Sequence, residues 1–247
     1  MEKSLTLYYP NDIIPLLKTC IIREMVITEG SLMQRTSQKV SMAVIRRLPK
    51  YYRYLENLLN KEIYRISSKE LSRIIGFTAS QIRQDLNCFG GFGQQGYGYN
   101  VEELYKEIGK ILGLVREYKS VIIGAGNLGQ AIANYSDFQR KGFKLKAMFD
   151  INPKLIGLKI RDVEILDVDN LEDFIKENDI EVGIICVPFS KAQETADRLI
   201  AAGIKGIWNF APFDIKVPDN IVIENVHLSE SLFTLSYLLN EYNNPED

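Results

Sequence analysis

The order of apolar and polar residues divides the chain into two regions with different patterns. Between residues 41 and 87, apolar residues recur at three- and four-residue spacing, which is typical of amphipathic helices packed on a shared core. Beyond residue 119, short apolar runs such as "SVIIG", "LKAMFD" and "IEVGIICVP" alternate with helical patterns. This alternation predicts a parallel sheet covered on both faces, so we expect a doubly wound α/β domain of the Rossmann type there.

The first region has the pattern of a helix-turn-helix. A long helix is predicted from "SMAVIRRLPKYYRYLENLL", and a second from "SSKELSRIIG", where Ser67 and Glu70 form a capping pair and Gly76 ends the helix. Thr78 is the expected N-cap of a short third helix. Its exposed face carries Ser80, Gln81, Arg83 and Gln84. A polar, arginine-bearing helix after a glycine turn is typical of DNA recognition.

The segment "FGGFGQQGYGYN" (residues 89–100) follows, with five glycines and four aromatic residues. Glycines allow tight turns and aromatic side chains can anchor the base of a hairpin, so a wing is predicted. A flexible interdomain linker is the alternative. No element is predicted before residue 39. The expected segments are therefore 1–38 (an uncertain N-terminal extension), 39–100 (winged helix), 101–118 (connecting helix), 119–228 (nucleotide-binding domain) and 229–247 (C-terminal helix and tail).

A glycine-rich turn joins the first strand and helix of the second region. In "SVIIGAGNLGQAIANY", Gly124, Gly126 and Gly129 form the G-x-G-x-x-G pattern. The first glycine permits the turn, the second lets a pyrophosphate approach the backbone, and the third lets helix pack on strand. Asp150 ends the next strand, 21 residues after Gly129. In dinucleotide-binding folds an acid at about this spacing accepts hydrogen bonds from the ribose hydroxyls. A carboxylate there repels a 2′-phosphate, so NAD(H) is expected over NADP(H).

Charge is distributed unevenly along the chain. The total is −2, but residues 1–100 carry +6 and the remainder −8, which favours a polyanionic partner for the first region. No apolar run reaches the roughly 18 residues of a membrane span, and no leader is recognised, so we expect a cytoplasmic protein with no membrane contact. The three cysteines, Cys20, Cys88 and Cys186, suggest neither disulfides nor zinc, and Cys186 is expected to be a buried small hydrophobe.

The second region lacks a clear acid-base group for hydride transfer. The single histidine, His227, lies at the end of the last predicted strand, where a capping or interface role is expected before a catalytic one. A small NAD-dependent dehydrogenase and a CoA-binding or ligase-like subunit remain alternatives. The first would need a substrate pocket, and the second would need neither Asp150 nor the helix-turn-helix.

The stretches "SMAVIRRLPKYYRYL", "SQIRQDLNCFGGFGQQGYGY", "VIIGAGNLGQAIANY", "FDINPKLIG" and "VPFSKAQETADRLIAAGIKGIWNFAP" resemble the Rex family of redox-sensing transcriptional repressors. The resemblance runs from about Lys39 to Asn240. It implies a homodimer with a winged-helix domain, a Rossmann domain and a last helix, "SESLFTLSYLLNEY", swapped into the partner subunit; packing on its own subunit is the alternative. It also implies that the protein is not an enzyme and holds no metal. It further implies that the protein binds a palindromic double-stranded operator of fermentation or respiration genes, and that NADH reverses this binding.

The resemblance implies two sets of site residues. NAD(H), as a regulatory ligand, would contact Gly124, Ala125, Gly126, Asn127, Leu128, Gly129, Asp150, Val187, Pro188, Phe189, Ala211 and Pro212, with Phe213 as a further ring contact. DNA would contact Ser80, Gln81, Arg83 and Gln84 on the recognition helix, Arg46, Arg47 and Lys50 on the first helix, and Gln94, Gln95 and Tyr97 in the wing. For Arg46 and Arg47 a solvated helix face is the alternative.

The chain departs from the family pattern at several of these positions. Gln84 stands where relatives commonly have lysine, and Gly91 and Gln94 where glutamate and lysine are usual. His227 stands where some relatives have an acid that pairs with the other domain. Fewer basic residues predict fewer phosphate contacts and a weaker dependence of DNA binding on salt.

Overall fold

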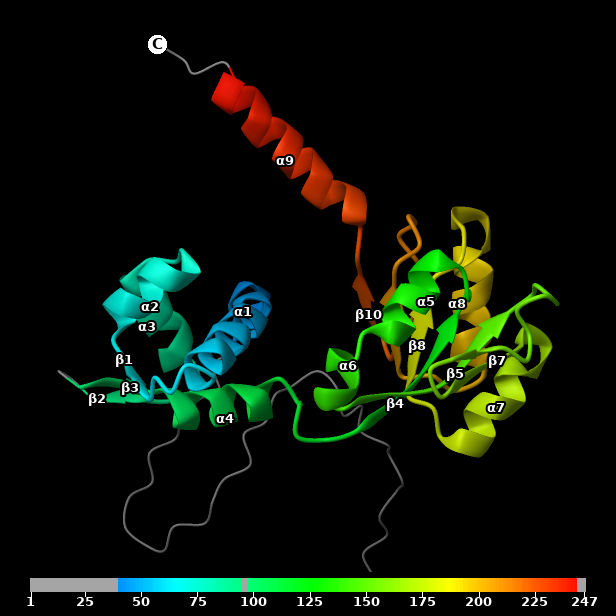
Figure 1. The fold of residues 1–247 in the computed structure, drawn as a ribbon, viewed down its shortest axis with the longest axis horizontal. Coiled ribbons are helices and arrows are strands. Elements are labelled where there is room, and N and C mark those ends of the chain that lie inside the picture. The colour runs from blue at the N-terminus through cyan, green and yellow to red at the C-terminus, as the bar shows by residue number, and fades with distance from the viewer. Residues whose placement is uncertain (1–39, 95–96, 244–247) are drawn as a thin grey trace, which may run out of the picture. The chain divides into compact units, whose positions relative to one another are not determined.

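The computed structural model describes residues 40–94 and 97–243. The chain divides into two compact units, the first ending at Leu112 and the second beginning at Gly113. Their helices and strands are labelled in chain order in Figure 1. Each unit has hydrophobic clusters of its own. The predicted extension over residues 1–38 lies outside the described residues, and so does Gln95, one of the predicted DNA contacts.

The described part of the first unit is a helical bundle with a small antiparallel sheet. Its elements are α1 (Met42–Leu59), β1 (Arg65–Ile66), α2 (Ser68–Ile75), α3 (Ala79–Asn87), β2 (Gly93–Gln94), β3 (Gly98–Asn100) and α4 (Val101–Ile111). The strands lie in the order β1-β3-β2. The fully buried side chains Leu48, Leu55, Leu71, Ile82 and Ile108 come from all four of these helices and form one core. This core holds the helix-turn-helix against α1 and α4.

The local signals that predicted the helix-turn-helix are confirmed. The Ser67 hydroxyl accepts a hydrogen bond from the Glu70 N–H at 3.1 Å, and the Glu70 carboxylate accepts one from the Ser67 N–H at 2.9 Å. Gly76 ends α2 with a left-handed φ of +82°. The Thr78 hydroxyl caps α3 by accepting from the Gln81 N–H at 3.1 Å. The recognition helix therefore begins at Ala79.

The predicted hairpin over residues 89–100 is also present. Strands β2 and β3 pair antiparallel, and β3 pairs in turn with β1. Tyr99 is buried and anchors the hairpin. Gly98 has a φ of +72°, and a Cβ there would come within 2.6 Å of the Ile66 carbonyl oxygen. The segment is thus a wing attached to the first unit and not a flexible linker.

The connecting helix is shorter than the predicted range of 101–118. Helix α4 ends at Ile111, and Gly113 follows with a φ of +74°. The Tyr105 ring stacks on Tyr52 of α1 with 4.3 Å between ring centroids. Helix α4 is therefore packed into the first unit.

The second unit is built on a seven-stranded sheet in the order β10-β9-β8-β4-β5-β7-β6. Its strands are β4 (Tyr118–Ile123), β5 (Phe143–Asp150), β6 (Lys159–Ile160), β7 (Val163–Asp167), β8 (Val182–Ile185), β9 (Gly206–Asn209) and β10 (Val222–Asn225). All neighbours are parallel except β6 and β7. The chain passes outward from β4 to β5 and then returns to β8, so the order reverses beside β4. Ligands bind at such a switch point in open α/β sheets.

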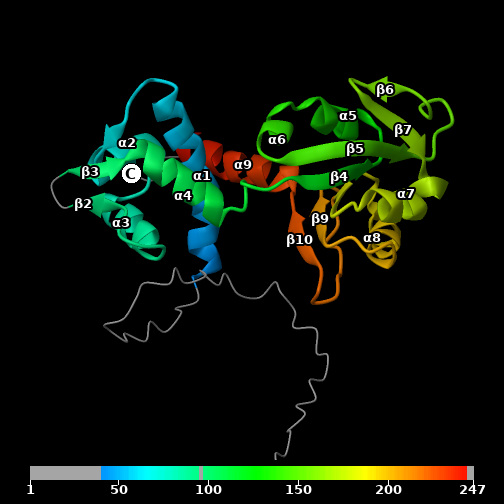
Figure 2. The same cartoon turned by 90° about the horizontal axis from the view of Figure 1, so that it is seen from below.

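Helices cover both faces of this sheet, as Figure 2 shows. The helical segments are α5 (Asn127–Asn134), α6 (Asp137–Arg140), η1 (Val168–Asn170), α7 (Leu171–Asn178), η2 (Phe189–Lys191) and α8 (Ala192–Ala201). Val121 and Ile123 of β4 pack with α7 and α8, whereas Ile122 faces the cluster that contains α5 and α6. The doubly wound α/β fold is confirmed.

Helix α9 (Leu228–Asn243) follows β10 and has no buried residue. Its side chains include Leu232, Leu235, Leu238 and Leu239, which are half or more exposed. None of the helices in the described ranges has the length and apolar character required to span a bilayer.

Candidate functional site

The glycine-rich turn between β4 and α5 is closely packed at two of its three glycines. Gly124 has a φ of +97°, and a Cβ there would lie 2.5 Å from the Cys186 carbonyl oxygen. A Cβ on Gly129 would collide with the Gly124 carbonyl oxygen. A Cβ on Gly126 would meet nothing within 4 Å. The fold therefore requires the first and third glycines, while the second borders open space where a ligand can approach the backbone.

Helix α5 begins at this turn with no side-chain cap. Its N-cap is Gly126, which has no side chain to accept hydrogen bonds from the first N–H groups. Asn127 is exposed, Leu128 is half-buried and Ala125 is buried. Uncapped N–H groups and the helix dipole favour an anion at this point.

The Asp150 carboxylate lies beside the same turn, at the end of β5. One oxygen accepts a hydrogen bond from the Ala125 N–H at 2.7 Å, and the other accepts from the Asn152 N–H at 2.8 Å. Each carboxylate oxygen retains a lone pair for a further donor, such as a ribose hydroxyl. The structure thus brings the predicted acid to the predicted glycine turn.

The remaining predicted ligand contacts follow β8 and β9 at the same edge of the sheet. Val187 and Pro188 come after β8, and Ala211 and Pro212 come after β9; Ala211 is buried and Pro212 exposed. The rings of Phe189 and Phe213 meet edge to face, 5.0 Å apart. Because carboxyl ends of parallel strands share one edge, these apolar residues lie along the same edge of the sheet as the glycine turn.

Asn209 fixes the loop after β9, a role that sequence reasoning missed. Its buried side-chain N–H₂ donates to the Phe213 carbonyl at 2.7 Å and to the Asn225 side chain at 2.8 Å. Its side-chain oxygen accepts from the Ala211 N–H at 2.9 Å. The sequence feature that indicates this role is a single amide within the apolar strand "GIWN" directly before a turn.

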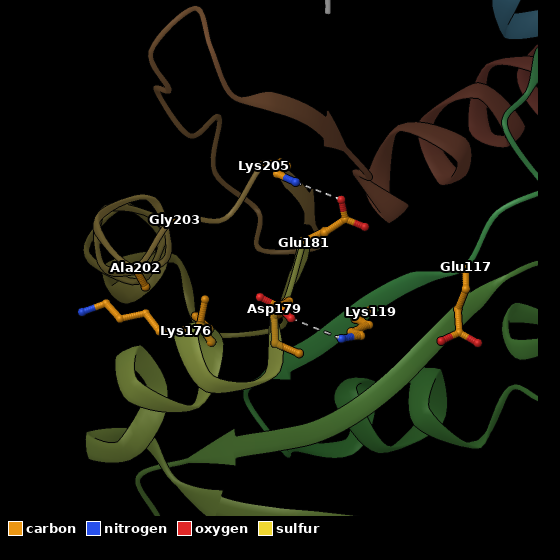
Figure 3. Close-up of a pocket in the computed structure, with 10 residues that line it drawn as sticks. Glu117, Lys119, Lys176, Asp179, Glu181, Ala202, Gly203 and Lys205 are labelled. Carbon is orange, nitrogen blue, oxygen red and sulfur yellow. Dashed lines mark hydrogen bonds and ion pairs between the residues drawn. The ribbon is translucent and has the colours of Figure 1, made fainter. Parts of the chain in front are cut away.

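A separate hollow of about 490 Å³ lies at the opposite edge of the sheet, where β4, β8 and β9 begin (Figure 3). Two pairs of opposite charges lie in its wall. The Lys205 ammonium is 3.1 Å from the Glu181 carboxylate, and Lys119 is 3.7 Å from Asp179. No predicted ligand residue lines this hollow, so it is distinct from the glycine-turn site.

Two further titratable groups lie near the glycine-turn edge. Cys186 is partly buried rather than buried as expected, and it packs beside the cluster of Ile122 and Ile132; this burial raises the pKa of its thiol to about 12, which fits a small hydrophobe. His227 Nε2 is 3.0 Å from an Asp214 carboxylate oxygen. Among residues 40–94 and 97–243, no group of three His, Cys, Asp or Glu side chains could hold a metal ion.

In the first unit, the recognition helix α3 exposes three of the predicted DNA contacts. Ser80, Arg83 and Gln84 are exposed, and Arg83 Nη1 donates to the Ser68 hydroxyl of α2 at 3.0 Å. Arg46 of α1 is exposed, and Tyr97 in the wing is 69% exposed. Gln94 belongs to β2 of that hairpin.

Three further predicted DNA contacts, Lys50, Arg47 and Gln81, interact with other residues of the first unit. Lys50 lies over the Phe77 ring of the helix-turn-helix turn, 4.7 Å from its centroid. Arg47 and Gln81 both donate to Asp85, at 2.6 and 2.8 Å. Asp85 is buried and was missed from the sequence, where it occupies an ordinary position of a polar helix.

A winged helix-turn-helix unit followed by a dinucleotide-type α/β unit defines a class of protein, the ligand-responsive DNA-binding regulators. Residues 39–87 match the family model described as putative DNA-binding protein N-terminus, and residues 115–213 match that of the CoA binding domain. The redox-sensing transcriptional repressor Rex of Thermoanaerobacter pseudethanolicus is 68% identical over 203 residues, which are 82% of this chain and 91% of that protein.

Two solved structures of RSP, a Rex-family repressor, have the same fold. The complex with β-NAD⁺ and operator DNA is 67% identical with a TM-score of 0.78, and covers 83% of this chain and 95% of that chain. The complex with β-NADH is 65% identical with a TM-score of 0.77, and the match covers 83% of this chain and 96% of that chain. The chain belongs to the Rex family of redox-sensing transcriptional repressors. This membership excludes the dehydrogenase alternative, and the CoA binding domain model covers only the second unit.

Proposed function

We propose that this protein represses transcription by binding operator DNA when NADH is low, and that NADH binding releases it. The observation that carries the proposal is the arrangement of Asp150 against the glycine turn, in a chain 67% and 65% identical to RSP molecules crystallised with β-NAD⁺ and operator DNA and with β-NADH. The second unit supplies the nucleotide site and the first unit supplies the DNA-binding helix.

In this proposal NAD(H) is a regulatory ligand bound along the carboxyl edge of the second unit's sheet. The ribose hydroxyls bond to Asp150, and the pyrophosphate lies over Gly126 at the start of α5. The nicotinamide lies against the apolar residues that follow β8 and β9. These are Val187, Pro188, Phe189, Ala211, Pro212 and Phe213.

The oxidised and reduced rings differ in charge, and this difference supports sensing. Burying the cationic NAD⁺ ring in an apolar site is unfavourable compared with burying the neutral NADH ring. A ligand shifts a conformational equilibrium only by its differential affinity for the two states. We therefore propose that NADH binds more tightly than NAD⁺ and favours the state released from DNA.

On DNA, α3 enters the major groove, where Ser80, Arg83 and Gln84 face base edges and phosphates. Arg46 and Lys50 contact the DNA backbone from α1, and Lys50 does so beside the Phe77 ring of the helix-turn-helix turn. Tyr97 extends from the wing toward the minor groove, where Gln94 and Gln95 are also predicted contacts.

The proposed assembly is a homodimer in which α9 packs on a second copy. Six apolar side chains of this helix are half or more exposed. In a single chain they would form a large apolar surface in contact with water, which is typical of an interaction site. They are Leu228, Leu232, Phe233, Leu235, Leu238 and Leu239. A two-fold dimer presents two recognition helices to successive turns of the groove, so the operator is palindromic. The proposed location is the cytoplasm, where DNA and NAD(H) meet, and the proposed targets are fermentation or respiration genes.

The test is fluorescence anisotropy of the protein on a labelled palindromic operator from its own promoter region, titrated separately with NADH and NAD⁺. We expect binding in the absence of nucleotide and in NAD⁺, and release by NADH. Binding that NADH leaves unchanged would contradict redox sensing, and no binding in any state would contradict repression. Analytical ultracentrifugation of wild type and of Leu235→Asp/Leu239→Asp tests the dimer, which the variant should dissociate.

A further inference from the structure

A buried carboxylate joins the recognition helix to α1. Asp85 is 1% exposed and accepts four hydrogen bonds, two on each oxygen. Arg47 donates through Nε at 2.6 Å and Nη2 at 2.7 Å, in the two-pronged geometry that guanidinium and carboxylate groups prefer. Tyr51, one turn further along α1, donates its hydroxyl at 2.8 Å, and Gln81 of α3 donates its amide at 2.8 Å.

This network makes the packing of α3 directional. Apolar contacts such as those of Leu48 and Ile82 favour burial but specify rotation weakly, because the hydrophobic effect is non-directional. Hydrogen bonds to all four acceptor positions of one carboxylate fix both its position and its orientation. Since Asp85 belongs to α3 and Arg47 and Tyr51 to α1, the network fixes how α3 is rotated about its own axis relative to α1.

Resting on the function proposed above, we propose that Asp85 is a positioning residue for operator binding, and that Arg47 acts through Asp85 and not as a phosphate contact. The network also orients the Gln81 amide, because a flipped amide would set its oxygen against the carboxylate. Helix α3 therefore meets the base edges in a rotation that its bonds to α1 determine.

The neighbouring arginine shows why Arg47 has a different role. Arg46 is exposed, whereas the Arg47 side chain is 24% exposed and its two-pronged donor group faces Asp85. To grip a phosphate with the same donors, Arg47 would have to leave a buried carboxylate with only neutral partners, which is strongly unfavourable. Sequence alone does not distinguish the adjacent arginines, but the two have different surroundings in the structure.

The salt dependence of operator binding separates the two roles. Each phosphate contact contributes about 0.9 to the slope of log affinity against log salt. We would measure that slope by anisotropy for wild type, Arg47→Gln, Asp85→Asn and the Arg47→Gln/Asp85→Asn double variant, with Arg46→Gln as the matched control. We expect each single variant to lose about tenfold in operator affinity at an unchanged salt slope. The double variant should lose no more than either single variant, because both substitutions break the same network. Arg46→Gln should reduce the slope by about 0.9.

Two results would overturn the proposal. One is a slope lowered by about 0.9 in Arg47→Gln, whether or not Asp85 is present, which would make Arg47 a phosphate contact. The other is unchanged affinity in Asp85→Asn. If a single variant fails to fold, as judged by circular dichroism, Tyr51→Phe removes only one hydrogen bond to Asp85. It should weaken operator binding severalfold at constant slope, and full affinity would contradict the proposal.

The same titrations keep this inference separate from the proposed function. NADH is added to each protein bound to the operator. Wild-type binding that NADH does not reverse would contradict redox sensing, while the slopes would still decide the role of Arg47. Normal release of the variants by NADH, at lowered operator affinity, is the result expected if Asp85 acts only in the first unit.

Discussion

The Asp150 carboxylate accepts a hydrogen bond from the Ala125 N–H at 2.7 Å. This contact ties the end of β5 to the glycine turn after β4, two segments 25 residues apart in the chain. A negative charge is thereby held beside the turn, at the position where dinucleotide-binding folds recognise the ribose. We propose that the selectivity of the nucleotide site depends on this pair.

Replacement of Asp150 by asparagine should weaken the preference for NADH over NADPH. The neutral amide loses charge-assisted bonds to ribose, which are about 1.5–3 kcal/mol each, and no longer repels a 2′-phosphate. Titrations of both nucleotides by calorimetry would measure the ratio. Asp179→Asn, at the opposite edge of the sheet, is the control and should leave the ratio unchanged. An unaltered ratio in Asp150→Asn would contradict the role of the carboxylate.

Replacement of Gly126 by alanine should impair nucleotide binding while leaving the fold intact. The added methyl group meets no protein atom within 4 Å, so stability should change by no more than about 0.5 kcal/mol. It would occupy the space in which a pyrophosphate approaches the backbone, and we expect NADH affinity to fall about tenfold or more. Gly129→Ala is the contrasting variant, because its methyl collides with the Gly124 carbonyl and should lower the melting temperature. Equal melting temperatures for both variants would argue against this division.

Replacement of Arg83 by alanine should reduce operator affinity by about 1–3 kcal/mol if its guanidinium reads a guanine. In the structure its Nη1 donates to the Ser68 hydroxyl, which holds the side chain on the α2 side of α3. Ser68→Ala removes that bond but keeps the arginine, and should cost less. Anisotropy on operators with single base changes would identify the base that Arg83 contacts. Full operator affinity of Arg83→Ala would show that Arg83 contributes only surface charge.

The two described cysteines should differ in reactivity. Burial raises the pKa of Cys186 to about 12, whereas Cys88 is exposed at the end of α3. Thiolates are the reacting species, so iodoacetamide at neutral pH should modify Cys88 well before Cys186. Mass spectrometry of the peptides measures both rates, with urea-unfolded protein as the reference in which both react. Equal rates in the folded protein would contradict the protection of Cys186 by partial burial.

Acid should weaken the first unit through Asp85. Burial alone would raise the pKa of this carboxyl, but the bonds from Arg47, Tyr51 and Gln81 outweigh it and hold the pKa below the ordinary 3.8. The contribution to stability is therefore complete above about pH 4 and is lost as the pH falls through the lowered value. Melting temperatures followed from pH 6 to pH 2 should fall more steeply for wild type than for Arg47→Gln/Asp85→Asn. Parallel curves would show that Asp85 contributes nothing.

Much of this fold could be predicted because its signals are local. The Ser67 and Glu70 capping pair, Thr78 and the glycines of the turn after β4 depend on residues close in sequence. The strands β6 and β7 were not predicted, because "KI" and "VEILD" are short and carry acidic residues between the apolar ones. Helix α4 ends early because Gly113 turns the chain.

The positioning residues could not be predicted, for a physical reason. Asp85 and Asn209 are polar side chains with partners distant in sequence: Arg47 and Tyr51 lie 38 and 34 residues from Asp85, and Asn225 lies 16 residues from Asn209. A helix pattern places Asp85 on α3 but does not reveal that Arg47 and Tyr51 meet it. The predicted ligand contacts follow local motifs, whereas the residues that hold them in place are defined by tertiary packing.

Asn209 also limits the freedom of the loop after β9. Its bonds to Ala211, Phe213 and Asn225 are made entirely within the second unit. Because all of these partners belong to the protein, the conformational entropy that the bonds remove from residues 210–213 is a cost of folding and not of ligand binding. A ligand that meets an ordered wall retains more of its interaction energy as affinity, so small chemical differences between two redox forms of one molecule can be expressed as a difference in occupancy.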